Sequence, residues 1–275
     1  MSLVTDAFPD YYAHPGPTTE LSDFADRVAE LPSDPERLAQ IVRGLVLHEG
    51  VAAHCGLKFS AERLADRERV GAAAILQRVL DFDDSSLATE RPAENRMVGY
   101  CYHFAVLHCA FLRAKGVPSR ARCGFAAYYR EGAWIDHWVV EYWNGGGWIV
   151  IDPDSGRNVV TPAEFHDAGR AWRLCRDGSE DASVHGNHVL WGWDELRGSL
   201  ISDLAALNKV EVGDWETWCD WIDIENKDQP DAELDAYLDP VAVLVSGEGA
   251  FQELRQAFDR DERVRPPPRL FECAD

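Results

Sequence analysis

The sequence predicts an α+β protein in which two largely helical regions flank a central antiparallel sheet. Apolar residues follow helical spacing between residues 19 and 91, and the pattern changes to a period of two between residues 120 and 152. After Pro153 a mixed pattern of helix and loop returns, with candidate helices at residues 162–175 and 194–207. Consecutive strands joined by a short hairpin are typical of an antiparallel sheet, and this order of patterns indicates one.

Length and composition exclude several classes of protein. The chain has 275 residues, of which 46% are hydrophobic, and this is enough for one large domain or two modest ones. Its net charge is −21, and it has no run of Lys and Arg that could neutralise a polyanion, so we expect no nucleic-acid partner. No apolar stretch approaches the ~20 residues that span a bilayer. The first ten residues carry two Asp and no basic residue, so we expect neither a membrane span nor a signal peptide.

The cysteines indicate a reducing compartment. There are seven of them, an odd number, and none forms a CxxC pair or the spacing of a disulfide framework or zinc site. We therefore expect a cytoplasmic protein whose thiols are mostly buried. A cysteine with special surroundings is then a candidate nucleophile. The seven are Cys55, Cys101, Cys109, Cys123, Cys175, Cys219 and Cys273.

The N-terminal region, residues 1–94, shows three helical segments. Thr19 or Ser22 can cap a first helix that ends before Pro32. Asp34-Pro35-Glu36 has the cap and the first-turn proline of a second helix. Helical spacing then continues in a third segment over residues 60–80.

The central segment begins with a helix over residues 101–115. Apolar spacing continues through it, and Gly116 with Pro118 forms a helix stop. Cys101 is thus expected in the first turn of a largely buried helix. The unpaired N–H groups and the positive end of the helix dipole favour a thiolate there, so Cys101 is the candidate nucleophile. His103 and His108 cannot reach its sulfur from their positions on the same helix.

A hairpin follows, and it offers a base. Side chains alternate along residues 134–143, and Asn144-Gly145 is a strong signal for a two-residue turn. With that turn His137 lies opposite Asp152, close enough for a carboxylate to hold an imidazole. A turn over Gly145-Gly146, or a loop over residues 144–147, would put His137 opposite Asp154 instead. Pro153 favours the first alignment because it tends to end the strand at Asp152.

Together these residues suggest acyl-transfer chemistry. A thiol at a helix start, with a His and an Asp paired across a hairpin, supplies the nucleophile, base and orienting acid of such a reaction. The structural alternative is that His137 and Asp152 only pair at a strand end and that Cys101 belongs to the core. The pattern alone does not separate the two.

The central segment resembles the core of transglutaminase-like proteins. GYCYHFAVLHCAFLRAKGVPSRARCGF carries a Gly-x-Cys helix start and an Arg-x-x-Gly-x-Pro-x-Arg exit, and DHWVVEYW with GGWIVIDPD carries the His-x-Trp and Trp-x-x-x-Asp-Pro strands. The resemblance covers residues 95–154 and implies a papain-like fold with the catalytic Cys at a helix N-terminus packed on an antiparallel sheet. It departs from many relatives at Tyr102-His103, where they have a charged pair. The flanking regions, residues 1–94 and 155–275, show no comparable motif.

The resemblance also implies roles for residues. Cys101 would be the nucleophile, His137 the base and Asp152 the orienting acid, acting on an amide or thioester. The oxyanion would meet the backbone N–H of Cys101 and a second donor. Asn95 is a candidate because papain-like enzymes place a side-chain amide before the cysteine, although Asn also caps loops; Tyr100 and Trp134 are alternatives. Arg113 and Arg120, which bracket the helix exit, are expected to make structural salt bridges.

Two hypotheses of different class follow. The first is a cysteine enzyme with a peptide, protein, small amide or thioester substrate, working as a hydrolase or as an acyltransferase with an amine acceptor. The second is a catalytically silent interaction module that docks through the acidic, Trp-rich C-terminal region, residues 155–275. The complete Cys, His and Asp set favours the enzyme.

No cofactor or metal is expected. His185 and His188 are three residues apart, but Gly186 and Asn187 between them indicate a loop, and no zinc set is complete. The acidic residues between 220 and 228 lack the spacing of a calcium loop, so they are expected to form a solvated face. These acidic residues are Asp220, Asp223, Glu225 and Asp228.

Overall fold

The computed structural model confirms an α+β protein and describes residues 8–54, 56–213, 232–247, 249 and 251–267. The acidic segment at residues 214–231, with the carboxylates weighed above for calcium, lies outside the described residues. Cys55, Cys219 and Cys273 lie outside them as well. Among the helices of the described residues, none combines the length and the apolar character that a membrane span requires.

The chain divides into two compact units. The first comprises residues 1–121 and 139–160, and the second comprises residues 122–138 and 161–275. Strands β3 (Ser119–Ala126) and β4 (Trp134–Trp143) each contribute residues to both units. The predicted core at residues 95–154 therefore also contributes to both, and each unit is described by itself below.

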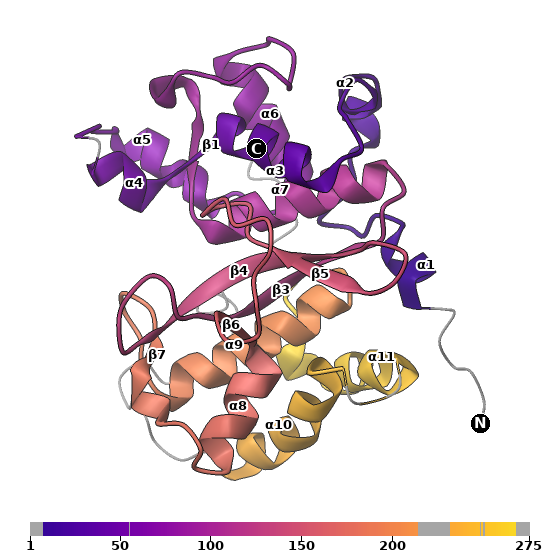
Figure 1. Ribbon diagram of the computed structural model, residues 1–275, viewed down its shortest axis with the longest axis vertical. Helices are drawn as coiled ribbons and strands as arrows, with labels where there is room; N and C mark the ends of the chain where they lie inside the picture. The colour runs from indigo at the N-terminus through magenta and orange to yellow at the C-terminus, as the bar shows by residue number, and fades with distance from the viewer. Residues whose placement is uncertain (1–7, 55, 214–231, 248, 250, 268–275) are drawn as a thin grey trace. The chain divides into compact units, whose positions relative to one another are not determined.

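The first unit is mainly helical (Figure 1). Its longer helices are α3 (Pro35–Leu45), α6 (Ala72–Phe82) and α7 (Cys101–Ala114). Its shorter helices are α1 (Phe8–Tyr12), η1 (Ser22–Phe24), α2 (Ala25–Ala29), α4 (Glu49–His54), α5 (Ala61–Leu64), η2 (Ala65–Glu68) and η3 (Ala93–Asn95). Its strands, besides parts of β3 and β4, are β1 (Val46–His48), β2 (Met97–Gly99) and β5 (Trp148–Ile151).

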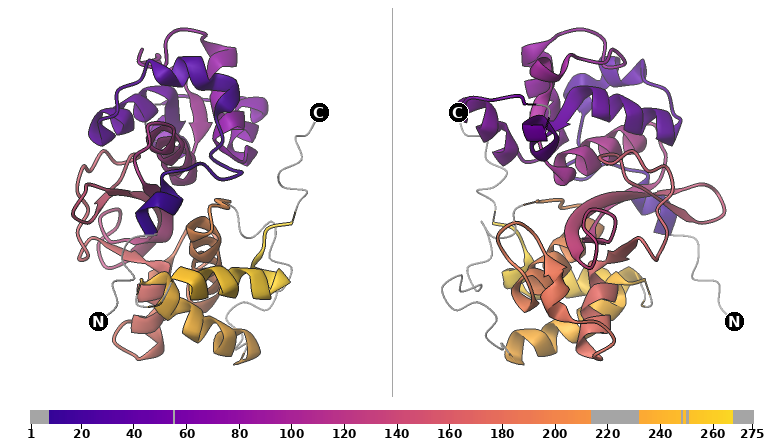
Figure 2. Two further views of the ribbon diagram at one scale, coloured as in Figure 1. Left: turned by 90° about the vertical axis from the view of Figure 1, so that its right-hand side faces the viewer. Right: turned by 60° about the vertical axis from the view of Figure 1, so that its left-hand side comes forward.

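Helix α7 is the central element of this unit. It lies beside α3 and α6 (Figures 1 and 2). Every residue from Cys101 to Arg113 is buried. A helix that is apolar on all sides is stable only when other elements surround it, as they do here. The helix ends as expected, with Gly116 at φ 71°, and Arg113 Nε donates to the carbonyl oxygen of Ser119 at 2.9 Å. Arg120 forms an ion pair with Glu141, so both arginines make structural contacts.

The N-terminal region agrees with the sequence prediction in part. Neither Thr19 nor Ser22 is the cap of η1 or α2, whose cap positions are Leu21 and Phe24. Asp34 caps α3 through the backbone N–H of Arg37, as predicted. Residues 60–80, in contrast, do not form one helix, because Gly71 adopts φ 85° and separates η2 from α6. The parallel pair of β1 and β2 was not predicted, because strands of three residues are too short to show a period of their own.

The predicted two-residue hairpin turn is wrong. Strands β4 and β5 pair with Val140 opposite Ile151 and Trp143 opposite Trp148, which leaves a four-residue loop at 144–147. The side chain of Asn144 explains this loop, because its Oδ1 accepts the backbone N–H groups of Gly146 and Gly147. The observed alignment is the alternative given above and does not put His137 opposite Asp152. It differs from the preferred one by two residues, and such a shift leaves each side chain on its original face of the strand.

The second unit contains three packed helices and the remaining strands (Figures 1 and 2). Helices α8 (Ala168–Arg176), α9 (Trp193–Leu207) and α10 (Ala232–Val245) contact one another. Helix α11 (Phe251–Arg260) contacts α9 and α10. The shorter elements are β6 (Phe165–Asp167), η4 (Ala182–Val184), β7 (His185–Gly186) and η7 (Glu262–Val264).

The sheet has the strand order β5-β4-β3-β6, with β7 beside β4. In the second unit β6 pairs with β3 in antiparallel fashion, and β7 pairs with β4 in parallel, with Trp134 opposite His185. The helix predicted at 194–207 is confirmed. The one predicted at 162–175 begins later, because β6 takes its first residues and Asp167 then caps α8 through the N–H of Arg170.

Candidate active site

Cys101 is the first residue of α7, as the sequence predicts. The preceding residue, Tyr100, has an extended backbone, and the helix of 14 residues starts directly after it. The side chain of Cys101 is in the buried class but keeps 7% of its surface exposed. A sulfur at this position meets the unpaired N–H groups and the positive dipole of a long helix, which favour the thiolate.

His103 braces this helix start. Its ring Nδ1 accepts the backbone N–H of Tyr100 at 3.2 Å. The backbone N–H of His103 donates to the backbone carbonyl of Tyr100 at 2.9 Å. A glutamate or glutamine usually makes the first of these contacts from the third helical position. Here burial lowers the pKa of His103 to about 3, so the ring is neutral and Nδ1 is free of a proton and able to accept. The sequence signal for this role is the position of His103 in the first turn of the helix. From the sequence, His103 was considered only as a possible base.

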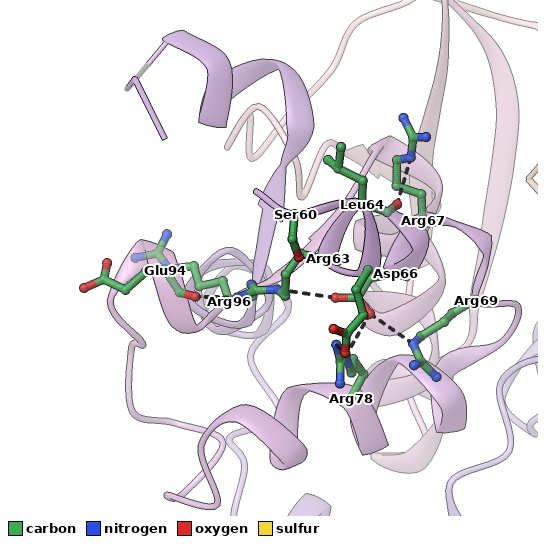
Figure 3. Close-up of polar contacts among 10 residues, drawn as sticks. Ser60, Arg63, Leu64, Asp66, Arg67, Arg69, Arg78, Glu94 and Arg96 are labelled. Carbon is green, nitrogen blue, oxygen red and sulfur yellow. Dashed lines mark hydrogen bonds and ion pairs between the residues drawn. The ribbon is translucent and has the colours of Figure 1, made fainter. Parts of the chain in front are cut away.

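An arginine cluster holds the segment next to His103 (Figure 3). The buried carboxylate of Asp66 accepts from Arg78 Nε at 2.8 Å and forms ion pairs with Arg63 and Arg69 at 3.7 and 3.5 Å. Backbone groups of this same segment, at residues 67 and 69, lie close enough to the His103 ring to act on its pKa. The cluster thus fixes a segment against which the first turn of α7 packs.

Asp152 lies in the first unit at the end of β5 and organises a turn. Its Oδ1 accepts the backbone N–H groups of Asp154 and Ser155 at 2.9 and 3.1 Å, and its Oδ2 accepts the Ser155 hydroxyl. Its own backbone pairs with Arg157. The side chain is fully buried. These donors fix the orientation of the carboxylate, which is what an orienting acid requires.

His137 lies in the second unit, on β4, and is 3% exposed. Two tyrosines contact it there. Tyr129 places its hydroxyl 3.3 Å from Nε2, and its ring centroid is 4.9 Å from the imidazole. Tyr128 contacts the imidazole edge-on at 6.0 Å. Neither tyrosine was predicted as a neighbour of His137, because both lie in the segment before β4, outside the strand pattern.

A second histidine in the first unit also lies near the helix start. His48 ends β1, where it pairs with Gly99 of β2, two residues before Cys101. Its Nε2 lies 3.7 Å from Asp154 Oδ2, and its ring stacks at 6.4 Å on Phe104 of α7. His48 was not predicted as a neighbour of Cys101, because no local sequence pattern connects residue 48 with residue 99. The pairing of β1 with β2 brings these two residues together.

The three candidate oxyanion donors occupy different surroundings. Asn95 ends η3 and is half-buried, and Tyr100 packs edge-on against His103 at 4.7 Å. Trp134 stacks on His166 at 3.9 Å in the second unit. Their assignment as oxyanion donors stays a prediction, and so does the assembly of Cys101, Asp152 and His137 into one site.

Comparison with known proteins supports the motif-based resemblance. Residues 72–153 match the model of the transglutaminase-like superfamily. No curated protein matches the chain. Among solved structures, it is similar to a chain described as "a Putative Cysteine Protease from Cytophaga hutchinsonii", with 15% identity and a TM-score of 0.37. That similarity covers 61% of this chain and 48% of the other, so it spans less than half the length of the other chain.

Proposed function

We propose that this chain, whose residues 72–153 belong to the transglutaminase-like superfamily, is a cysteine enzyme that carries an acyl group on Cys101. The observation that carries the proposal is the position of Cys101 as the first residue of a long buried helix. None of the other described cysteines shares it. Cys109 lies within α7, Cys123 lies within β3, and Cys175 lies near the end of α8.

In the proposed mechanism the Cys101 thiolate attacks the carbonyl carbon of an amide or thioester. The bond to the leaving nitrogen or sulfur breaks as His137, in its imidazolium form, donates a proton to it. The acyl group then remains on Cys101 as a thioester. Water or an amine attacks this thioester, neutral His137 takes up its proton, and the thiolate leaves.

Asp152 is proposed to orient His137 and to stabilise its charged form. Two observations support this role. Three donors from residues 154 and 155 hold the carboxylate in place. The backbone of Asp152 also pairs with Arg157, which fixes the position of this residue directly after β5.

The reaction type depends on the acceptor. With water the enzyme is a peptidase or amidase, and with an amine it is an acyltransferase. The competing hypothesis is a silent interaction module. A silent module has no need for a thiol at a braced helix start, so the packing around Cys101 favours the enzyme.

Labelling with iodoacetamide tests the nucleophile. Near neutral pH, Cys101 should be alkylated faster than Cys109, Cys123 or Cys175. All four are buried, so faster labelling would reflect the helix start rather than exposure. Peptide mass spectrometry after short exposure measures the four rates in one sample. Equal or slower labelling of Cys101 would contradict the assignment.

An acyl donor tests the chemistry. We expect p-nitrophenyl acetate to release one equivalent of p-nitrophenolate rapidly and to leave an acetyl group on Cys101. Dividing the acetylated protein between buffer and buffer with methylamine then shows whether water or the amine releases the acetyl group. Cys101→Ala should abolish the burst, and Cys109→Ala, a cysteine of the same helix, should retain it. If Cys101→Ala behaves like the wild type, the enzyme hypothesis is wrong.

A further inference from the structure

Three side chains that can each bind a metal ion, a cysteine, a glutamate and a histidine, lie close together in the second unit. None of them is a residue proposed for catalysis. Cys175 is in the last turn of α8, Glu180 is in the following loop, and His185 begins β7. One ligand atom from each lies within 4.8 Å of those of the other two. All three fall within eleven residues with the spacing Cys-x4-Glu-x4-His. From the sequence, His185 was considered as a metal ligand together with His188. The fold instead places His185 next to Cys175 and Glu180.

The hydrogen bonds of His185 show which nitrogen is available. Nδ1 lies 3.2 Å from the backbone carbonyl of Asp181 and 3.7 Å from Cys175 Sγ. Because the carbonyl oxygen can only accept, Nδ1 carries the proton. Nε2 then presents a lone pair, and Glu180 Oε2 lies 3.2 Å from it. Both atoms are buried and have no hydrogen-bond partner. A metal-bound histidine typically shows this arrangement, with its other ring N–H donated to a backbone carbonyl.

Two acceptors that face each other need a proton or a cation between them. A bound divalent cation meets this need, because it accepts the lone pairs of both atoms and keeps a coordinating thiolate and carboxylate ionised.

Aromatic rings enclose the group. Phe125 meets the His185 ring edge-on at 5.0 Å, and Trp134 lies parallel to it at 6.1 Å. The side chain of His185 is fully buried. His166, stacked on Trp134, places its unpartnered Nδ1 3.6 Å from the second oxygen of Glu180. A site lined by sulfur and imidazole and shielded from water suits a borderline-soft metal rather than Mg²⁺ or Ca²⁺, which prefer oxygen ligands.

We propose that Cys175, Glu180 and His185 bind one zinc ion through Sγ, one carboxylate oxygen and Nε2. On binding, the Cys175 thiol releases its proton to solvent. Zinc bonds of about 2.0–2.3 Å at tetrahedral angles separate ligand atoms by about 3.3–3.7 Å. Atoms that lie within 4.8 Å of one another therefore approach by about 1.5 Å at most when they bind zinc. Water, or His166 after a side-chain rotation, completes the coordination.

The proposed ion would connect the end of α8 to β7. His185 pairs with Trp134 in the β7–β4 ladder, and Trp134 precedes His137 by three residues on the same strand. The ion would thus stabilise the part of β4 that carries the proposed base. We expect zinc to raise the melting temperature of the chain, because only the folded state assembles the three ligands.

Titration of the full chain with Zn²⁺ and Co²⁺ tests the proposal. After treatment with EDTA and removal of the chelator, the wild type should bind one equivalent of Zn²⁺. With Co²⁺ it should show a thiolate-to-cobalt charge-transfer band in the near ultraviolet and the intense visible bands of tetrahedral cobalt. Lack of stoichiometric binding, or cobalt bands without the charge-transfer band, would overturn the proposal. If stoichiometric binding is lacking, we would conclude that a proton shared by Glu180 and His185 occupies the place of the ion.

Variants identify the ligands. Cys175→Ser should lose the charge-transfer band and the thermal shift, and His185→Gln should weaken Zn²⁺ binding at least tenfold. Cys123→Ser, a buried cysteine of the same unit, and Cys101→Ala should retain both signals. Circular dichroism of the metal-free forms checks folding, and His185→Gln serves if Cys175→Ser does not fold. Retention of the charge-transfer band in folded Cys175→Ser, or its loss in Cys101→Ala, would place the metal elsewhere and contradict the proposal.

Discussion

The imidazole of His103 occupies the space that a side chain on residue 99 would need. A Cβ atom added to Gly99 would lie 2.9 Å from Cγ and 3.0 Å from Nδ1 of that ring. The same ring accepts the N–H of Tyr100, so it contacts both residues that precede Cys101. The Gly-x-Cys motif therefore has a physical reason in this chain: glycine leaves room for the residue that braces the helix start.

Gly99→Ala should disturb this brace. Because the ring and the buried backbone cannot both keep their positions, we expect a loss of about 1–3 kcal/mol in the free energy of unfolding. We also expect slower alkylation of Cys101. Urea denaturation and the iodoacetamide rate measure the two effects. Gly147→Ala is the matched control, because a Cβ there meets no atom within 4 Å. Wild-type stability and labelling in Gly99→Ala would show that the contact is unimportant.

His103→Leu removes the acceptor but keeps an apolar side chain of similar size. The backbone N–H of Tyr100 would then lack its acceptor, which costs about 1–3 kcal/mol when a donor is buried. We expect Cys101 to react more slowly as well, since the first turn of α7 is less well fixed. The alkylation rate of the folded variant is the decisive measurement. An unchanged rate would mean that His103 stabilises the helix without affecting the sulfur.

Stability should fall in mild acid because of the buried histidines of α7. Burial lowers the pKa of His108 to about 4, and its Nε2 lies 2.9 Å from the carbonyl of Pro35. Between pH 6.5 and 4 the unfolded chain binds a proton at this residue while the folded chain does not, so stability falls with pH by about 1.4 kcal/mol per unit. In His108→Gln the slope should be smaller by that amount over this range. Urea denaturation at a series of pH values measures it, and above pH 7 the two curves should run parallel.

Asp152→Asn separates catalysis from folding. Asn keeps an oxygen that can accept the N–H groups of residues 154 and 155, so the turn should persist with a modest loss of stability. Loss of the charge should lower kcat for the acyl donor by about 10²–10⁴-fold, as expected for an orienting acid. Ser155→Ala, which removes a donor and leaves the carboxylate, is the control and should retain activity within about tenfold. Equal activity of Asp152→Asn and wild type would limit Asp152 to a structural role.

Tyr129→Phe tests whether the hydroxyl 3.3 Å from His137 Nε2 positions the base. A hydrogen bond of ordinary strength corresponds to about a 2–10-fold change in kcat/KM. We also expect a shift in the pH profile of kcat/KM, which a purely structural contact would not produce. The tyrosine is 46% exposed, so the fold should tolerate the change. Tyr128→Phe is the control, and a common response of both variants would argue against a specific role of the Tyr129 hydroxyl.

Local chemistry explains which elements the sequence could predict. The start of α7 at Cys101 and its end at Gly116 depend on first-turn and cap preferences, and the cap of α3 depends on Asp34 and Pro35. Each is decided within a few residues. The hairpin was predicted, but its register was not, because the side chain of Asn144 stabilises a loop two residues longer than the dipeptide Asn-Gly suggests.

The sequence by itself determined the class of fold, the placement of Cys101 at a helix start, and the strand position of His137. It also contains the motif spacing by which the central segment resembles transglutaminase-like proteins, since motif spacing is a property of the chain. Only the tertiary structure decided that His103 packs against Gly99 and that His48 pairs with residue 99. It likewise brought Glu180 and His185 to Cys175. The physical reason is that these contacts depend on burial and on pairing between strands, which the periodicity of a single segment does not encode.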